Sequence, residues 1–361
     1  MNLLNTDFLE ENYLTTIKQR KISGRYITLN DIEPLYDDLD TAIASKKIGE
    51  SEQGKAIYQL KLGSGKLKLG SGKIGSGKIK ILIWSQMHGN ESTGTKAVFD
   101  FLKYIKAYKN TEIVNSILNN CDITIIPMLN PDGAEVYTRV NANDVDLNRD
   151  AVALEAKESK LLREILDTVK PQFCFNLHDQ RTIFGVEGTK NPATISFLAP
   201  SEEITRKLTK GREQTMNVIV AMNALLQKLI PNHIGRYNDE FYPTATGDNF
   251  QKLGHNTILI EAGHYPDDYE RETVRKYNFY ALLQGIYHVA TEKNFTSHLD
   301  YFSIPNNIKN FYDVIYRSEK NKKDVAFQYV EKVENGKFAL SLMKEKEGDL
   351  SSNIAHKEEL L

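Results

Sequence analysis

A histidine and a glutamate three residues apart, His88 and Glu91, follow the apolar run at residues 79–84. The β-branched residues of that run predict a buried strand, and in open α/β proteins metals and substrates bind where such strands end. A neutral imidazole and a carboxylate at this spacing can bind one Zn²⁺ from the same side. Because the pattern His-x-x-Glu is common by chance, the pair needs further ligands to define a metal site.

A second histidine, His178, follows the apolar run 173–177 and is therefore also expected at a strand end. Two His and one Glu are a ligand set of catalytic zinc sites, with one coordination position left for water. Taken alone, His178 could equally be an ordinary core or loop histidine. Its place beside a second predicted strand of the same sheet favours a site for one Zn²⁺ per chain, held by His88, Glu91 and His178.

Asp146 is a candidate partner for His88. A ligand histidine usually donates its other ring N–H to a carboxylate or a carbonyl, and Asp146 could accept that hydrogen bond. The alternative is that Asp146 is a turn residue with no link to the metal site.

Predicted strands and helices alternate around these residues. The strand patterns lie at 79–84, 123–127, 173–177 and 257–260, and the helical patterns at 93–107, 154–169, 204–229 and 270–291. This alternation predicts an α/β fold with a mixed, mainly parallel central sheet and helices on both faces. Before it, residues 6–47 are expected to form two helices, with Asp31 as an N-cap, followed by strands at 47–51 and 56–62.

The segment 63–78 contains three near copies of Gly-Ser-Gly-Lys. Residues 72–78 match the first seven positions of a phosphate-binding P-loop, but Ile79 replaces the Ser or Thr that should follow, and a strand pattern replaces the helix. A flexible, basic, exposed turn is therefore favoured over a nucleotide site.

The sequence pattern changes near residue 304, from alternating strands and helices to strands alone. Three alternating runs follow, and Asn335-Gly336 between the last two is typical of a tight hairpin turn. We predict a catalytic domain at 1–303 and a small β-rich appendage at 304–361. The appendage is too small to fold stably alone and is expected to pack on the main domain.

Composition narrows the class of protein. The 361 residues are 40% hydrophobic and 26% charged, with a formal net charge of −2, so neither a nucleic-acid partner nor a membrane partner is indicated. The acidic start lacks a secretory pattern, and Cys121 and Cys174 lie in apolar runs where buried, reduced thiols are expected. A cytoplasmic location is predicted, and a disulfide between the two cysteines is the alternative.

Four motifs in order carry a family resemblance. They are Asn130-Pro131-Asp132-Gly133, Asp146-Leu147-Asn148-Arg149, Leu177-His178-Asp179 and Glu261-Ala262-Gly263-His264. Their order and spacing resemble the zinc carboxypeptidase family, the carboxypeptidase A-like metallopeptidases, over about residues 30 to 292. The compact segment 139–149 looks more like bacterial cytoplasmic members, which trim cell-wall peptides.

The resemblance implies roles for further residues. Glu261 would be the general base and acid, a task for which a carboxylate at a buried strand end is suited. Asn148 and Arg149 would bind the terminal carboxylate of the substrate, and Arg139 would stabilise the oxyanion. Tyr242 is our choice for the substrate-capping tyrosine, with Tyr237 as the fallback.

Two more residues are candidates for substrate binding. Asp248 could meet an amino group on a basic or diamino-acid substrate, although it could equally cap a loop. His264 could line the substrate pocket or support a residue that does.

The predicted function is that of a zinc-dependent metallocarboxypeptidase, a hydrolase that cleaves a C-terminal peptide or amide bond. Water activated by the metal would attack, and the substrate would be a peptide or amino-acid amide with a free carboxylate. One alternative is an N-acyl-amino-acid deacylase of the aspartoacylase or succinylglutamate desuccinylase type, which His88-Gly89-Asn90-Glu91 also resembles. The other is a binding module with a dead site, against which the intact ligand set argues.

Overall fold

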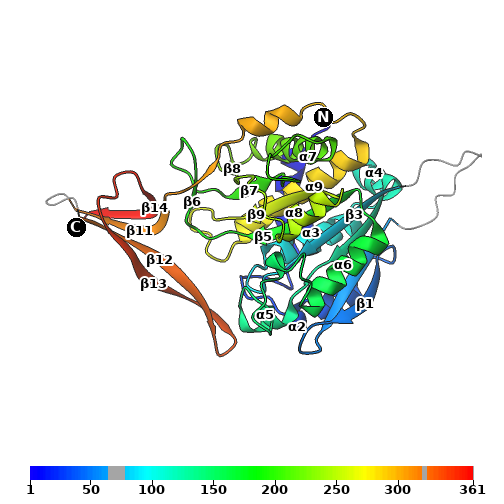
Figure 1. Cartoon of the computed structure of the whole chain (residues 1–361), viewed down its shortest axis with the longest axis horizontal. Helices are drawn as coiled ribbons and strands as arrows, with labels where there is room; N and C mark the ends of the chain where they lie inside the picture. The colour runs from blue at the N-terminus through cyan, green and yellow to red at the C-terminus, as the bar shows by residue number, and fades with distance from the viewer. Residues whose placement is uncertain (64–77, 319–322, 361) are drawn as a thin grey trace, which may run out of the picture.

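The computed structural model describes residues 1–63, 78–318 and 323–360. Most of the Gly-Ser-Gly-Lys repeat lies outside these residues, so its interpretation as an exposed turn stays a prediction. The described chain forms a large α/β body and a smaller β-sheet beside it (Figure 1). The predicted fold class is therefore confirmed.

An eight-stranded mixed sheet runs through the α/β body in the order β1-β2-β4-β3-β5-β9-β7-β8. Its strands are β1 (Ala44–Glu50), β2 (Ala56–Leu62), β3 (Ile79–Ser85), β4 (Cys121–Ile126), β5 (Phe173–Asp179), β7 (Ile195–Leu198), β8 (Ile234–Arg236) and β9 (Asn256–Ala262). The four central strands β4, β3, β5 and β9 are mutually parallel, whereas β1, β2 and β7 pair antiparallel to their inner neighbours.

Helices cover both faces of this sheet. They are α3 (Thr93–Ala107), α4 (Glu112–Asn120), α7 (Lys210–Leu226) and α9 (Glu272–Thr291) on one face, and α6 (Lys157–Val169) and α8 (Thr246–Lys252) on the other. Side chains alternate along β3 to serve both layers: Ile81 and Ile83 join the larger core, while Leu82 and Trp84 join the smaller one. A strand buried on both faces must be apolar throughout, which explains the continuous apolar run.

The register of the central strands brings their carboxyl ends level. Ser85 at the end of β3 pairs with Leu177 on β5, and His178 on β5 pairs with Glu261 on β9. Side chains in the loops beyond these ends therefore meet at one edge of the sheet, where ligands of α/β proteins bind.

The N-terminal region is helical, but its helices are short. Its elements are α1 (Thr6–Asn12), a π-helical turn (Tyr13–Ile17), α2 (Leu29–Ile32) and a 3-10 helix (Glu33–Asp38). The prediction of Asp31 as an N-cap is wrong: Thr28 is the N-cap, and Asp31 is the third helical residue, which closes a reciprocal capping box with Thr28.

A buried ion pair fixes this N-terminal region to the body. Arg275 of α9 donates to both carboxylate oxygens of Asp100 on α3, at 2.8 and 2.7 Å, and Tyr13 donates to the same carboxylate at 2.9 Å. The two-pronged contact satisfies charges that would be costly to bury unpaired.

A four-stranded sheet follows the body, in the order β13-β12-β11-β14. Its strands are β11 (Phe311–Arg317), β12 (Asp324–Glu334), β13 (Lys337–Gly348) and β14 (Ile354–Leu360). Asn335 and Gly336 both have positive φ, at +52° and +72°, which is the turn expected between β12 and β13. We call these four strands the C-terminal sheet.

The C-terminal sheet has a small core of its own, with Ile315, Ala326 and Leu350 as its buried residues. Between it and the body, β10 (Asn307–Lys309) pairs with β6 (Phe184–Val186) of the body. Tyr269 also donates to Asp313 on β11. The domain boundary near residue 304 stays a prediction, and these contacts join the two parts across it.

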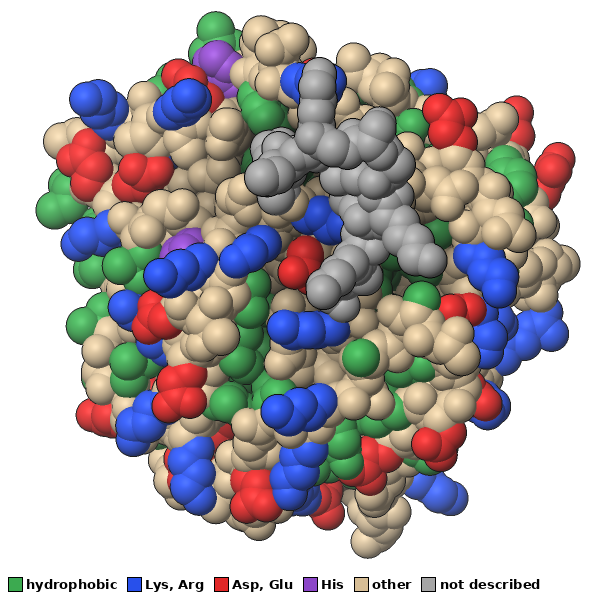
Figure 2. Space-filling model, turned by 90° about the vertical axis from the view of Figure 1, so that its right-hand side faces the viewer, with side chains coloured by type: hydrophobic (Ala, Val, Ile, Leu, Met, Phe, Trp, Pro, Cys, Tyr) green, Lys and Arg blue, Asp and Glu red, His purple; other side chains and the backbone are tan. Residues whose placement is uncertain are grey.

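The remaining elements are α5 (Pro131–Val136), a 3-10 turn (Leu147–Arg149) and a 3-10 helix (His298–Ser303). Cys121 and Cys174 are buried with free thiols, as predicted. Figure 2 shows the face that lies away from the C-terminal sheet, where acidic and basic side chains are intermingled, in keeping with a net charge near zero.

Candidate metal centre

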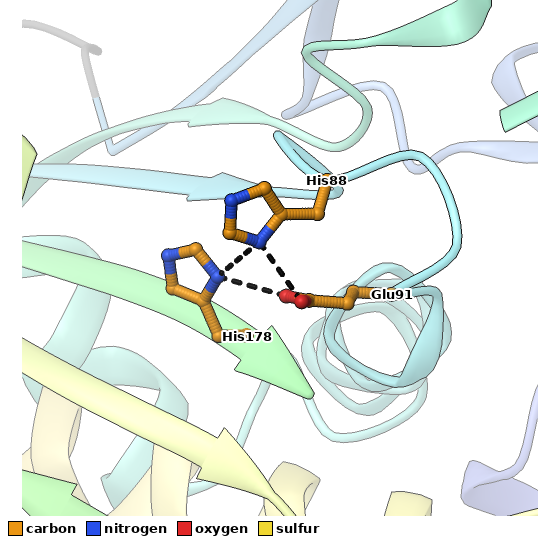
Figure 3. Close-up of side chains that lie close together, drawn as sticks. All are labelled: His88, Glu91 and His178. Carbon is orange, nitrogen blue, oxygen red and sulfur yellow. Dashed lines mark hydrogen bonds and ion pairs between the residues drawn. The ribbon is translucent and has the colours of Figure 1, made fainter. Parts of the chain in front are cut away.

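Three side chains from separate segments converge at the carboxyl edge of the sheet (Figure 3). His88 follows β3, Glu91 precedes α3, and His178 lies near the end of β5. Nδ1 of His88 is 2.9 Å from Oε1 of Glu91, Nδ1 of His178 is 2.8 Å from Oε2, and the two Nδ1 atoms are 3.1 Å apart. All three residues are buried, and their ligand atoms lie within 4.8 Å of one another.

The hydrogen bonds of His88 bear on whether this cluster suits a metal. Its Nε2 lies 3.0 Å from Oδ1 of Asp146, and because a carboxylate only accepts, Nε2 carries the proton. In the neutral ring, Nδ1 then carries a lone pair on the side of Glu91, His178 and Arg139. Two imidazoles and a carboxylate are a donor set that fits Zn²⁺.

The electrostatics of Glu91 and His178 favour the protonation states of metal ligands, whereas the neighbouring carboxylates of Glu91 and Asp146 outweigh burial and raise the pKa of His88. Burial alone would raise the pKa of Glu91, but the facing charges of His88 and His178 outweigh it and hold that pKa well below its usual value. Burial lowers the pKa of His178. An ionised carboxylate and a neutral imidazole are the forms that bind metal.

Arg139 lies beside the cluster. Its Nε donates to Oδ2 of Asp146 at 3.0 Å, and its Nη1 lies 3.1 Å from Nδ1 of His88 and 3.3 Å from Oε1 of Glu91. Asp146 thus contacts both His88 and Arg139, and it holds the guanidinium at the candidate site.

Glu261 is the register partner of His178 and lies at the end of β9. Burial, reinforced by the charges of Glu91 and Asp179, raises the pKa of Glu261 well above its usual value. The carboxyl group therefore holds a proton more readily than an exposed glutamate does.

A cavity of about 330 Å³ contains these groups, a size at the lower end of small-ligand sites. Its lining residues are Arg25, His88, Asn90, Glu91, Arg139, Asn148, Arg149, His178, Asp179, Gln180, Arg181, Phe184, Tyr237, Glu261, Arg271 and Glu331. Beyond the three candidate ligands, the lining is dominated by arginines and carboxylates, so the cavity suits a small charged ligand.

Asn148 and Arg149 lie on the Asp146 side of the cluster. The backbone N–H of Asn148 donates to Oδ1 of Asp146 at 2.9 Å, and its side-chain oxygen accepts from the N–H of Thr246 at 3.1 Å. The guanidinium of Arg149 lines the cavity next to it.

Asp179 lies on the other side of the cluster. Its backbone N–H donates to Oε2 of Glu91 at 3.1 Å, and its carboxylate pairs with Arg271 at 3.0 Å. The cavity therefore has two charged ends, one at Asn148 and Arg149 and the other at Asp179 and Arg271.

Besides Asp146, three candidate residues lie outside the residues that line the cavity. Tyr242 is 53% exposed and donates to Glu240. Asp248 accepts from the N–H of Tyr242 at 3.1 Å, and burial raises its pKa to about 6. His264 stacks on His356 of the C-terminal sheet, with ring centroids 4.0 Å apart.

The fallback tyrosine, Tyr237, does line the cavity. Its hydroxyl donates to Oε1 of Gln180 at 2.6 Å. Burial and the charges of Glu261 and Glu91 raise the pKa of Tyr237 well above its usual value. The hydroxyl therefore stays protonated, and a ligand that accepts its single proton would do so in place of Gln180.

Sequence reasoning missed several lining residues, among them Arg25, Gln180, Arg271 and Glu331. Arg25 lies in the N-terminal region, Arg271 precedes α9 with a left-handed φ of +54°, and Glu331 is one of many charged residues on β12. Gln180 directly follows β5 and the motif that ends at Asp179, so its position was a signal in the sequence. The other three follow no buried strand within a motif, and the sequence holds no signal that would single them out.

The α/β fold carries two His and one Glu at its strand ends, a donor set suited to Zn²⁺. Comparisons with known proteins point to the same metal. Residues 31–176 match the family model described as zinc carboxypeptidase. Carboxypeptidase SOL1 of Arabidopsis thaliana is 27% identical over 210 residues, which are 53% of this chain and 41% of that protein. Carboxypeptidase 2 of Trichophyton tonsurans is 26% identical over 132 residues, which are 36% of this chain and 23% of that protein.

Solved structures share the fold. A metallo-carboxypeptidase from Burkholderia cenocepacia superposes with a TM-score of 0.58 and 16% identity, covering 76% of this chain and 70% of that one. Carboxypeptidase A from Helicoverpa armigera superposes with a TM-score of 0.55 and 15% identity. The superposition covers 79% of this chain and 80% of that one.

The chain is similar to zinc carboxypeptidases in sequence over residues 31–176 and shares their fold, in line with the resemblance noted in the sequence. It spans about two fifths of the length of the Arabidopsis relative and less than a quarter of the Trichophyton relative. Within the described residues, the helices are too short or too polar to cross a membrane.

Proposed function

We propose that this protein is a zinc-dependent metallocarboxypeptidase that hydrolyses a C-terminal peptide or amide bond. The observation that carries the proposal is the convergence of His88, Glu91 and His178 in a cavity that also contains Glu261 and Arg149. The match of residues 31–176 to the zinc carboxypeptidase family model supports the same activity. The substrate would be a peptide or amino-acid amide with a free carboxylate.

His88, Glu91 and His178 would hold one Zn²⁺. When bound, Zn²⁺ supplies Lewis-acid chemistry, polarising the scissile carbonyl and lowering the pKa of water. Asp146 would keep the imidazole of His88 in the tautomer that presents Nδ1 to the metal, through the 3.0 Å contact at Nε2.

The charged groups around the cluster would orient the substrate. Asn148 and Arg149 would bind the terminal carboxylate, because a guanidinium matches a carboxylate with two parallel hydrogen bonds. Arg139, whose Nη1 lies 3.3 Å from Glu91, would stabilise negative charge on the carbonyl oxygen.

Glu261 would move the proton. A carboxyl group whose pKa is raised by burial and by neighbouring carboxylates can take a proton from water and later give it to the leaving amine. Tyr237 would donate a hydrogen bond within the cavity, a task for which its protonated hydroxyl is suited.

The deacylase alternative rested on Gly89-Asn90 between the first two ligands. Gly89 has a packing reason that is independent of the reaction: a Cβ there would lie 1.9 Å from the backbone carbon of Gly133. A glycine at this position follows from the close approach of the loop to α5, so it does not favour a deacylase.

The test is zinc analysis together with hydrolysis assays. Purified protein should carry close to one zinc per chain, and it should release C-terminal residues from peptides faster than it cleaves acetyl- or succinyl-amino acids. Glu261→Gln should keep the zinc and lose hydrolysis, whereas Glu164→Gln, on the exposed side of α6, should change neither. Hydrolysis that persists in metal-free protein, or in the Glu261 variant, would refute the assignment.

A further inference from the structure

One wall of the cavity comes from outside the α/β body. Glu331 lies on β12 of the C-terminal sheet, yet it lines the same cavity as the candidate zinc ligands. The hairpin formed by β12 and β13 reaches back toward α5 (Figure 1). The C-terminal sheet is therefore part of the candidate site as well as a neighbour of it.

Two residues of the body hold Glu331 in place. Nη2 of Arg25 lies 2.5 Å from Oε1 of Glu331, and the hydroxyl of Tyr137 donates to Oε2 at 2.9 Å. The same two side chains pack on Phe338 of β13: the guanidinium of Arg25 lies 5.4 Å from the ring centroid, and the ring of Tyr137 meets it edge-on at 5.5 Å. Contacts from both sides fix the carboxylate relative to the cavity.

Glu331 is more accessible than the two arginines packed around it, and Arg181, which also lines the cavity, is exposed. The side chain of Glu331 is 25% exposed, whereas those of Arg25 and Arg271 are 5% and 2% exposed. Arg25 pairs with Glu331, and Arg271 pairs with Asp179. The facing charges of Arg25 and Arg271 outweigh the effect of burial and lower the pKa of Glu331, so its carboxylate is ionised at neutral pH.

This carboxylate can still bind a ligand. A carboxylate offers about four acceptor positions and no donor, and contacts with Arg25 and Tyr137 occupy two of them. A ligand group that meets Glu331 must therefore be a hydrogen-bond donor, and a positively charged donor gains the most from an ionised carboxylate.

The position of Glu331 indicates which part of a substrate would carry this donor. Arg149 lies at the Asp146 end of the cavity, and Glu331 lies on the side of Asp179 and Arg271, with the candidate zinc ligands between the two ends. A peptide whose terminal carboxylate is held at Arg149 would therefore direct the residues before its scissile bond toward Glu331.

We propose that Glu331 is a specificity residue that accepts the free ammonium group of a short peptide, so that the C-terminal sheet completes the substrate site. This inference rests on the proposed carboxypeptidase function. It implies that the protein prefers short peptides with an unblocked amino terminus over the same peptides with a neutral acyl cap.

The test is a comparison of kcat/KM for peptides of two to five residues, each with a free, an acetylated or a succinylated amino terminus. In the wild-type zinc-loaded protein, acetylation should lower kcat/KM by about tenfold or more at the length whose ammonium reaches Glu331, the effect of losing one charged hydrogen bond. Glu331→Gln should bring the ratio for free and acetylated peptides close to one.

Two further variants separate recognition from folding. Glu331→Asp keeps the charge on a shorter side chain and should lower the ratio in part. Glu334→Gln, on the same strand and paired only with Lys332 in the described structure, should leave it unchanged. Thermal unfolding and zinc content of each variant show whether the hairpin is still in place.

The possible outcomes are distinct. If the wild-type protein hydrolyses no peptide at any length, the proposed function falls, and this inference falls with it. If peptides are hydrolysed but acetylation changes kcat/KM less than twofold at every length, the inference alone is overturned. Faster cleavage of succinylated peptides would also overturn it and would assign this end of the cavity to the exposed Arg181.

Discussion

Replacing Gly89 with alanine tests how closely the loop that carries the first two candidate ligands must approach α5. The added Cβ would lie 1.9 Å from the carbonyl carbon of Gly133 and 2.2 Å from the N atom of Ala134. Both are backbone atoms of a short helix that is anchored on the same loop, since the amide of Asn130 caps the helix and donates to the carbonyl of Met87. No side-chain rotation relieves this clash.

The size of the effect follows from the distances. Ordinary van der Waals contact begins at 3.4 Å, so the loop and α5 must separate by about 1.5 Å, and overpacking of this kind costs about 1–3 kcal/mol. Metal–ligand distances tolerate shifts of only about 0.2 Å. Because His88 and Glu91 flank Gly89, a displacement several times larger than this tolerance should weaken zinc binding by about tenfold to a hundredfold, as lesser disturbances around zinc sites do.

Competition of the protein with a zinc-binding dye would measure the loss of zinc affinity. Denaturant unfolding of the metal-free protein would measure the loss of folding free energy separately. Gly247→Ala is the matched control, since its Cβ would find its nearest neighbour at 3.6 Å and α8 gains helix propensity. A Gly89→Ala protein with wild-type zinc affinity and wild-type unfolding would refute the packing argument.

Three further predictions concern single side chains. Asp146→Asn should keep the fold and weaken zinc binding by about tenfold to a hundredfold, because the amide no longer fixes the tautomer of His88; a zinc titration measures it, and unchanged affinity would contradict the role of Asp146. Tyr237→Phe should lower kcat/KM by about tenfold through loss of a donor in the cavity, whereas Tyr242→Phe should not; equal kinetics would contradict the assignment. Burial lowers the pKa of His356 from 6.5 to about 4, so between these pH values the unfolded chain binds a proton that the folded chain does not. The free energy of unfolding should therefore be unaffected by this group above pH 6.5 and should fall by up to about 3 kcal/mol as the pH drops toward 4. His356→Phe should flatten this part of the curve of unfolding free energy against pH, and an unaltered slope would contradict the argument.

The candidate ligands could be found in the sequence because each lies beside an apolar run. His88, His178 and Glu261 come at or just after strands that are buried on both faces, and such strands are visible as continuous apolar segments. The register between strands then brings these residues together without further information. Arg149 was found through its motif and lines the same cavity.

The candidate residues that lie outside the cavity lining depend on contacts that are distant in sequence or on irregular segments. The ring of His264 packs on His356, 92 residues later, and no local pattern predicts that a strand from the C-terminal sheet will cover it. Tyr237 and Tyr242 lie in one irregular segment between β8 and α8, where no periodicity tells which ring turns inward. Asp248 lies near the start of α8 and accepts a hydrogen bond from the backbone N–H of Tyr242, which fits the alternative that it caps a loop.

The fold was predictable at the level of its layers but less so in its details. The helix at Thr93–Ala107 was predicted to the residue, because its apolar positions recur at helical spacing. The prediction missed β7, β8 and β14, which have between three and seven residues, too few for a pattern to stand out. The strand order likewise depends on pairings between distant segments, which local patterns do not encode.

The outer strands of the two sheets affect how copies of the protein meet in concentrated solution. At the rim of the large sheet, β1 carries Lys46 and Lys47, and at the rim of the C-terminal sheet, β13 carries Lys344 and Lys346. Backbone groups along a rim strand can template a strand from another molecule, but docking there would bring these ammonium groups close to the same charges on the second copy. The lysines therefore disfavour strand pairing between copies, and their replacement by β-branched apolar residues should promote fibrils or precipitation.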